Sequence, residues 1–499
     1  MSVYKKFIGQ TAVYGISTVL SRLFNFILTP IYTRVYPKGV YGIFTNIYAN
    51  ASIINAILAF GMESTYFRYL NKFEDKKQEV YNNSFLCIAF ISTLFLLTGI
   101  VFNEQIAGYL ANKPSEIPDY KQYVNFFLWI LFIDAISVIP FAKLRADEMA
   151  MSYSVAKFLN IGCFVGFNLF FIYGIPAIIK HHWLGADWLA TWYRHHWVGY
   201  VFIANLIASI VTFIYLIPQF LQLQLRFDKK LFAAMFSYSW PILVANLSFI
   251  VNENLDKIVL NKLLPPAVAN GEVGIYGAVC KIAIFLSIFI TAFRLGAEPF
   301  FFSHAKHKDA KNTYATILQY FVIALAIIFV ALIANIEILK YFISRDEKHI
   351  AEFWVGLPAV PYLLLGYVCL GIYMNLSVWY RLSDQTRFGL YISVAGAIIT
   401  IVLNLVLIPR FSYMGSAWTS MLAYLVMMVL SYVLGQKYYP IPYNLKKILA
   451  YLVISTAIVF SSFFIFHRNI YIGNAMLIVF VAGIFYVEKD GLMKILKKG

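Results

Sequence analysis

The stretch RLFNFILTPIYTRVYPKGVYG, residues 22–42, has a counterpart in KIVLNKLLPPAVANGEVGIYG, residues 257–277. Both stretches carry a proline, a glycine and a Tyr-Gly pair at matching positions, 235 residues apart. The same spacing relates Glu63 to Glu298 and holds without a gap over 46 positions, up to Phe67. A constant spacing through two apolar segments and the turn between them indicates that half of the chain has been duplicated.

The composition is typical of a polytopic membrane protein. Of 499 residues, 61% are hydrophobic and 13% charged, and the mean hydropathy is +0.72. Soluble domains contain about half apolar and about a quarter charged residues. We therefore expect an all-α protein whose helices cross a bilayer. The net charge of +16 does not indicate nucleic acid as a partner, because basic cytoplasmic loops give the same total. The four cysteines fall in apolar runs, so no disulfide is expected.

Fourteen segments are long and apolar enough to cross a membrane, which takes about 20 residues of helix. If the N-terminus is cytoplasmic, the alternate loops on that side hold 23 Lys and Arg residues, and the other side holds 11. The richer side is cytoplasmic, which places both termini there. The predicted spans cover approximately residues 8–36, 40–68, 81–102, 121–142, 152–175, 197–220, 232–262, 274–302, 313–335, 353–377, 388–408, 413–434, 446–466 and 470–487.

The duplication extends over twelve of these spans. Arg145 and Arg381 are 236 residues apart, whereas Gly199 and Gly415 are 216 apart, so the first half has about 20 extra residues in the loop 181–197. Six spans per half give two parallel lobes, related by an axis along the membrane normal, with a cavity between them. We predict lobes at residues 1–225 and 226–440, followed by two extra spans and a tail at 441–499.

Short motifs in the repeat occur in a fixed order. They are TPIYTR at 29–34, YG at 41–42, DK at 256–257, GIY at 274–276, EPFFF at 298–302, NL at 404–405, IP at 408–409 and GSA at 415–417. As a set they resemble the Wzx-like polysaccharide flippases of the MOP (multidrug/oligosaccharidyl-lipid/polysaccharide) exporter superfamily. The resemblance implies a MATE-like fold with two six-helix lobes around a central cavity. It also implies alternating access and a polyprenyl-pyrophosphate-linked oligosaccharide as the substrate.

Basic residues within the predicted spans are candidates for binding that substrate, because charge inside a membrane is costly and indicates function. Arg22 is about 24 Å from either end of its span at 1.5 Å per residue. The resemblance implies that the first two helices of each half line the cavity, where a pyrophosphate needs counter-charges. The candidate substrate-binding residues are Arg22, Lys257, Lys281 and Arg294.

Acidic residues leave two interpretations open. Glu253 and Glu298 lie four residues from Lys257 and Arg294 and could neutralise them on one helix face. Alternatively, acids could bind H⁺ or Na⁺ and couple export to an ion gradient. Asp134 fits best, because it lies near the middle of a span with no basic residue within a turn. A protonated Asp134 bonded to a neighbouring helix is the other reading.

Two further charged positions near the cytoplasmic ends of spans are less specific. Glu63, like Glu253 and Glu298, is a candidate for ion coupling, but its position also fits a structural salt bridge. Lys157 lies about one and a half turns from the end of its span, so we expect it to extend toward the interface.

The loop 181–197 contains two histidine pairs and several tryptophans. The spacing of the histidines is not that of metal ligands, and the tryptophans are typical of a membrane interface. No GxxxxGK[ST] motif is present, so an ion gradient, the membrane potential or downstream consumption must supply the energy. We expect no cofactor and no bound metal.

The sequence therefore predicts a flippase of the bacterial inner membrane, not an enzyme, that moves a lipid-linked oligosaccharide to the outer leaflet for surface polysaccharide synthesis. Its expected partners are that substrate, membrane lipids, H⁺ or Na⁺, and polysaccharide polymerase or glycosyltransferase machinery. A lipid II flippase and a multidrug or cation antiporter of the same superfamily are the alternatives. A membrane-embedded glycosyltransferase would need the histidine pairs for catalysis.

Overall fold

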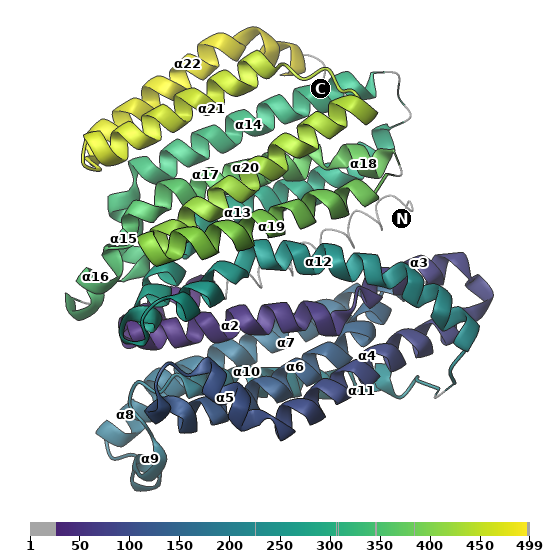
Figure 1. The fold of residues 1–499 in the computed structure, drawn as a ribbon, viewed down its shortest axis with the longest axis vertical. Helices are drawn as coiled ribbons and strands as arrows, with labels where there is room; N and C mark the ends of the chain where they lie inside the picture. Colours follow the sequence, from purple (N-terminus) through teal and green to yellow (C-terminus); the bar gives the residue numbers. More distant parts are fainter. Residues whose placement is uncertain are drawn as a thin grey trace. The chain divides into compact units, whose positions relative to one another are not determined.

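The computed structural model describes residues 26–224, 226–305, 307, 309–344, 347–383 and 385–496. In this part of the chain every regular element is a helix (Figure 1). Contacts divide the chain into two compact units, residues 1–274 and 275–499. The expected all-α class is confirmed.

The first unit is built from eleven named α-helices in the described residues, preceded by helical residues 26–35. A π-helical turn, Phe170–Gly174, joins α7 to α8. The helices are α2 (Lys38–Ala59), α3 (Met62–Lys72), α4 (Lys77–Val101), α5 (Asn103–Leu110), α6 (Ile117–Ala146), α7 (Ala150–Leu169), α8 (Ile175–Lys180), α9 (Ala186–Trp192), α10 (Gly199–Tyr215), α11 (Ile217–Phe220) and α12 (Lys229–Leu263).

Helix α13 (Pro266–His304) begins in the first unit and continues into the second. The rest of the second unit is also helical in its described residues. Its helices are α14 (Ala310–Ala334), α15 (Ile336–Ile343), α16 (Glu347–Trp354), α17 (Val360–Leu376), α18 (Val378–Leu382), α19 (Arg387–Phe411), α20 (Tyr413–Tyr438), α21 (Leu445–Phe460) and α22 (Ile470–Leu496).

Twelve helical segments of the described chain are long and apolar enough to cross a membrane. They correspond to twelve of the predicted spans, whereas the count of fourteen is not confirmed. The predicted first span begins outside the described residues. The predicted sixth span is divided at Leu216 into α10, which is only 17 residues long, and α11. Pro218 near the start of α11 explains the break, because proline cannot donate the helical backbone hydrogen bond.

The two units repeat one packing pattern. In the first unit α4 packs against α6, and α10 packs against both α6 and α7. In the second unit α14 packs against α17, and α20 packs against both α17 and α19. These helices correspond in the order that the sequence spacing predicts, which agrees with a duplicated half. Helix α12 packs mainly against α2 and thus belongs to the first unit by its contacts; the predicted lobe boundary after residue 225 describes the repeat and stays a prediction.

Glycines of the repeated motif allow two backbones to touch within the first unit. A Cβ atom on Gly42 of α2 would lie 1.7 Å from the carbonyl oxygen of Asn270, and one on Gly274 would lie 1.9 Å from that of Lys38. A side chain at either position would therefore force the start of α2 away from the start of α13. Gly61 is needed for another reason: it has φ +66, a left-handed conformation that ends α2 and starts α3.

The two C-terminal helices pack against α14 in the second unit. Glu488 of α22 is 3% exposed at its side chain, and three donors satisfy its carboxylate. Tyr451 Oη lies 2.6 Å away, Lys447 Nζ 2.9 Å and Gln319 Nε2 3.1 Å. A buried carboxylate with all of these partners holds α21 and α22 onto the repeat.

Candidate functional site

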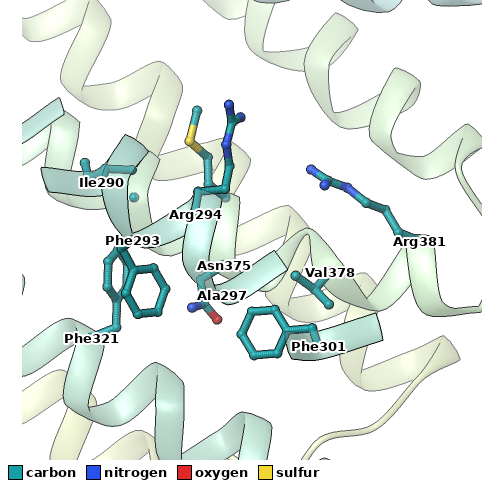
Figure 2. A pocket seen from close by; sticks show the side chains of 11 residues that line it. Ile290, Phe293, Arg294, Ala297, Phe301, Phe321, Asn375, Val378 and Arg381 are labelled. Carbon is teal, nitrogen blue, oxygen red and sulfur yellow. The ribbon is translucent and has the colours of Figure 1, made fainter. Parts of the chain in front are cut away.

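A pocket with two arginines lies inside the second unit, between α13, α14, α17 and α18. It is narrow, with a free volume of about 20 Å³. Arg294 of α13 and Arg381 of α18 both line it, and Figure 2 shows the side chain of Arg381 extending toward Arg294. The walls are aromatic and aliphatic: the rings of Phe293 and Phe321 stack with centroids 4.1 Å apart. The two guanidinium groups thus lie beside largely apolar walls, where a charge is poorly solvated and any charged or polar neighbour interacts with it strongly.

A neutral donor completes the pocket. Asn375 of α17 is 9% exposed, and its Nδ2 atom has no hydrogen-bond partner among the described residues. Figure 2 shows its amide group at the pocket. Arg381 donates a hydrogen bond of 3.3 Å from Nη2 to Ser377 Oγ, which orients the guanidinium. A buried amide without a partner costs about 1–3 kcal/mol, so a ligand that accepts from it would gain that energy.

The pocket lies toward one end of its helices. Arg381 is next to the last residue of the candidate span Ala351–Leu382, and Arg294 lies ten residues before the end of α13 at His304. The distribution of Lys and Arg predicts that this end is cytoplasmic. A charged group could therefore enter the pocket from the headgroup region.

The other predicted cations have different surroundings. Lys257 of α12 is 14% exposed at its side chain, and its Nζ lies 2.9 Å from Asp256 Oδ1 and 2.7 Å from the backbone oxygen of Glu253. Asp256, whose side chain is 2% exposed, therefore balances the charge of Lys257. The backbone oxygen of Glu253 is a further hydrogen-bond acceptor. Lys281 is partly buried on α13. Arg22 lies outside the described residues.

Of two further acidic candidates, Glu298 and Glu63, the structure describes the side chain of Glu63 only. The side chain of Glu298 lies outside the described part, so its pairing with Arg294 stays a prediction. Glu63 of α3 forms a salt bridge with Arg145 of α6, at side-chain exposures of 47% and 31%. The Arg145 guanidinium also lies 4.8 Å from the ring centroid of Phe67. This geometry is that of a structural pair between α3 and α6.

Asp134 belongs to a polar cluster within the first unit. Its carboxyl group on α6 lies close to Ser209 of α10 and within electrostatic range of Lys157 of α7 and Tyr48 of α2. Tyr48 Oη accepts a hydrogen bond of 2.9 Å from Asn205 Nδ2. Four helices therefore contribute polar groups to one place in an apolar bundle. Lys157 points to this cluster and to the ring of Phe141, 4.4 Å from its centroid, whereas the sequence predicted that it would extend toward the interface.

The repeat shows that neither site is required by the fold. Asp134 corresponds to Leu370 at the spacing of 236 residues, and Leu370 is buried. Conversely, Arg294 corresponds to Ala59 at the spacing of 235, and Asn375 to Ile139 at 236. Equivalent helices pack with apolar residues at these three positions, so Asp134, Arg294 and Asn375 each belong to one half alone. Arg381 differs, because its equivalent is Arg145, which pairs with Glu63 in the first unit.

The sequence identified Arg294 and Asp134 but missed their partners. Arg381 was assigned to a cytoplasmic loop, although its spacing from Arg145 placed it in the repeat. Asn375 gave no signal, because an amide in an apolar run is ordinary. The predicted cavity between the two halves concerns the arrangement of the units and stays a prediction.

Comparisons with known proteins agree with this architecture. Residues 8–303 match the family described as polysaccharide biosynthesis protein, and residues 241–406 match the MatE family. An uncharacterized membrane protein of Methanocaldococcus jannaschii, MJ1068, is 22% identical over 97% of this chain and 94% of its own length.

Two solved structures share the fold. The lipid II flippase MurJ in an inward closed conformation has a TM-score of 0.66 at 13% identity, covering 95% of this chain and 99% of that one. An inward-facing multidrug resistance MATE family transporter of the MOP superfamily has a TM-score of 0.62 at 15% identity, covering 86% and 95%. The chain belongs to the polysaccharide biosynthesis protein family, and its multi-span helical fold is that of these MurJ and MATE structures.

Proposed function

We propose that this protein flips a polyprenyl-pyrophosphate-linked oligosaccharide from the cytoplasmic to the outer leaflet of the cytoplasmic membrane, for the synthesis of a surface polysaccharide. The observation that carries the proposal is the pocket shared by Arg294 and Arg381. Each planar guanidinium can donate two parallel hydrogen bonds to phosphate oxygens. The Asn375 amide supplies a further donor. Together they suit a compact, multiply charged anion.

The size of the pocket limits what it holds. Its free volume is about 20 Å³, room for about one water molecule and far below the roughly 300–1,000 Å³ of ligand pockets. The helices around it must therefore move apart to admit a pyrophosphate group, and the lipid chain and the glycan stay outside. Because the pocket lies toward the end of the spans that we predict to be cytoplasmic, it serves as the loading site for a headgroup made in the cytoplasm. Lys257 and Lys281, and Arg22 in the undescribed segment, remain candidates for later steps along the path.

We infer that the cluster around Asp134 couples this transport to an ion gradient. A carboxyl group beside Lys157 can exchange a proton when the surrounding helices shift and change its solvation. Lys157 supplies a tethered positive charge, which favours H⁺ over Na⁺ as the coupling ion, because a bound Na⁺ would lie beside another cation. Glu253 and Glu298 stay candidates for the same role.

Two related functions compete with this proposal. The likeness to MurJ favours lipid II, which also carries a pyrophosphate. A multidrug cation exporter is disfavoured by the two arginines, since a cationic drug would be repelled from their pocket. The pocket thus selects for the pyrophosphate, which both lipid-linked substrates carry. The sugar distinguishes an oligosaccharide flippase from a lipid II flippase.

The test is flipping by the purified protein in proteoliposomes. Three fluorescent substrates are compared: a polyprenyl-pyrophosphate oligosaccharide, lipid II, and a lipophilic cationic dye, each with an imposed proton or sodium gradient. We expect flipping of the oligosaccharide lipid, driven by the proton gradient. Flipping of lipid II in preference to the oligosaccharide lipid would identify lipid II as the substrate. Export of the dye alone would overturn the proposal.

A further inference from the structure

The extra residues of the first half fold into a defined element. Helices α8 and α9 are joined by five consecutive exposed residues, 181–185. Gly185 has φ +87, so the turn needs a residue without a side chain at that position. At the tip, Leu184 is fully exposed, and Trp183 and Trp188 are 60% and 67% exposed. Large apolar groups are thus presented together by a compact hairpin of two short helices.

This hairpin is fixed against the spans and does not project freely. The hydroxyl group of Tyr193 donates a hydrogen bond of 3.1 Å to the backbone oxygen of Phe171. Leu189 is buried in the apolar cluster that includes Phe171 and Tyr200. Arg194 binds Asp119 of α6 through two hydrogen bonds of 2.7 and 2.9 Å. The exposed side chains therefore have a fixed depth relative to the bundle.

That depth is the level of lipid headgroups. Helix α7, the π-helical turn and α8 form one candidate span, Ala150–Lys180, of 31 residues. At 1.5 Å per residue it is about 46 Å long, close to the roughly 40–45 Å of a bilayer with its headgroups. Phe171, to which Tyr193 is bonded, lies about 13 Å below the end of this span. The hairpin is thus folded back beside the interfacial layer.

The faces of α9 are distributed as an interfacial helix requires. With 100° between successive residues, Ala186 and Leu189 share the buried face. Trp188 and Trp192 share one exposed flank. The polar residues Asp187 and Thr191 lie on the opposite exposed flank. Tryptophan prefers the boundary between water and acyl chains, because its ring is apolar and its N–H is polar.

In its described residues, the second unit has no such hairpin between the corresponding helices. Helices α19 and α20, which correspond to α7 and α10, are joined at Ser412 alone. The insertion is thus not needed to connect two antiparallel spans. Its exposed apolar residues have no protein covering them in the described chain.

We propose that residues 181–196 are a membrane-interface anchor that inserts Trp183, Leu184 and Trp188 among the lipids of one leaflet, which the distribution of basic residues predicts to be the outer one. The occupant of this surface is lipid and not a soluble glycan or protein, because the hairpin lies beside the spans at headgroup depth and its tip carries an aliphatic leucine. This inference does not depend on which substrate the protein flips.

The test places a fluorescent probe on each flank of the hairpin. Leu184→Cys and Trp188→Cys are labelled in the full-length protein, and Thr191→Cys, on the polar flank of the same helix, is the matched control. Cys163 and Cys280 are replaced by alanine, whereas Cys87 and Cys369 are buried and can stay; the protein without an added cysteine gives the labelling background. The labelled proteins are reconstituted at low density in phosphatidylcholine and phosphatidylglycerol vesicles, without glycan or partner.

We expect lipids that carry a quencher near the headgroup to quench the probes at 184 and 188 several-fold more than the probe at 191. A water-soluble quencher should show the reverse order. Equal accessibility of all three probes to the water-soluble quencher would overturn the proposal in favour of a soluble partner. Probes protected from both quenchers would overturn it in favour of a second copy of the chain.

Discussion

Arg294 of α13 and Arg381 of α18 are 87 residues apart in the sequence and line the same pocket of the second unit. The fold does not require a cation at the position of Arg294, because the equivalent residue in the first unit is Ala59. We propose that this pair of arginines, beside phenylalanine rings in a membrane protein, binds an anionic ligand. The account of function depends on this pair.

Substitutions in the polar cluster around Asp134 should affect stability and transport separately. Asp134→Asn removes a buried carboxyl group within electrostatic range of Lys157, so thermal stability should fall by less than the about 3–5 kcal/mol that breaking a buried ion pair costs. Adding Lys157→Met should restore much of that stability without restoring transport that depends on a proton gradient. Thermal unfolding in detergent and proteoliposome flipping measure the two effects. Flipping by Asp134→Asn that still follows the proton gradient would show that Asp134 is not the coupling group.

The salt bridge between Glu63 and Arg145 should behave as a structural pair. Both side chains are substantially exposed, so Glu63→Gln should cost no more than about 1 kcal/mol of stability. Its proton-driven flipping should match that of the unmodified protein. Loss of gradient dependence in this variant would instead return Glu63 to the ion-coupling site.

Close contact of backbones predicts a strong effect of a small change. Gly42→Ala places a methyl group 1.7 Å from the carbonyl oxygen of Asn270, so the start of α2 must move away from α13. Overpacking of this kind costs about 1–3 kcal/mol or more. Gly39→Ala is the control, since a Cβ there meets no atom within 4 Å. A melting temperature equally unaffected in both variants would contradict the close contact.

The start of α12 should give the protein a dependence on acid pH. The backbone N–H of Leu231 donates to Asp228, and together with nearby Lys76 this holds the pKa of that carboxyl group below its usual range. A lowered pKa means that Asp228 stabilises the fold fully above the ordinary pKa of aspartate. That contribution is lost as the pH falls through the lower pKa of the folded state. Asp228→Asn should therefore melt earlier than the unmodified protein at pH 7, and the difference should narrow as the pH falls below the ordinary pKa of aspartate; a difference that stays constant down to the lowest pH at which the protein folds would contradict this assignment.

Helix order and the repeat were predictable because apolar length and residue spacing are local properties of the sequence. The spacing of 235 and 236 residues correctly paired helices that occupy equivalent places in the two units. Contacts between helices were not predictable in the same way. Asp134 and Lys157 are 23 residues apart, and only the packing of α6 against α7 and α10 brings them together. The sequence therefore showed an isolated acid where the structure has an acid with a lysine.

The ends of helices explain the other differences. Arg381 was placed in a loop because the apolar run ends before it, whereas α18 continues the helical path to Leu382. The four-residue rule left a pairing of Lys257 with Glu253 open, and the structure adds the adjacent Asp256 as a partner of its ammonium group. Such choices between nearby partners depend on side-chain rotamers, which residue spacing does not determine.

The central claim is tested most directly by measuring how tightly the purified protein binds a polyprenyl-pyrophosphate lipid. Arg294→Ala and Arg381→Ala each remove hydrogen bonds to a charged group, worth about 1.5–3 kcal/mol, so the account predicts roughly a tenfold to hundredfold weaker Kd. Arg387→Ala is the matched control, because Arg387 is exposed at the start of α19 and does not line the pocket. Its Kd should equal that of the unmodified protein. A folded variant that lacks both Arg294 and Arg381 and still binds the lipid with unchanged Kd would contradict the account.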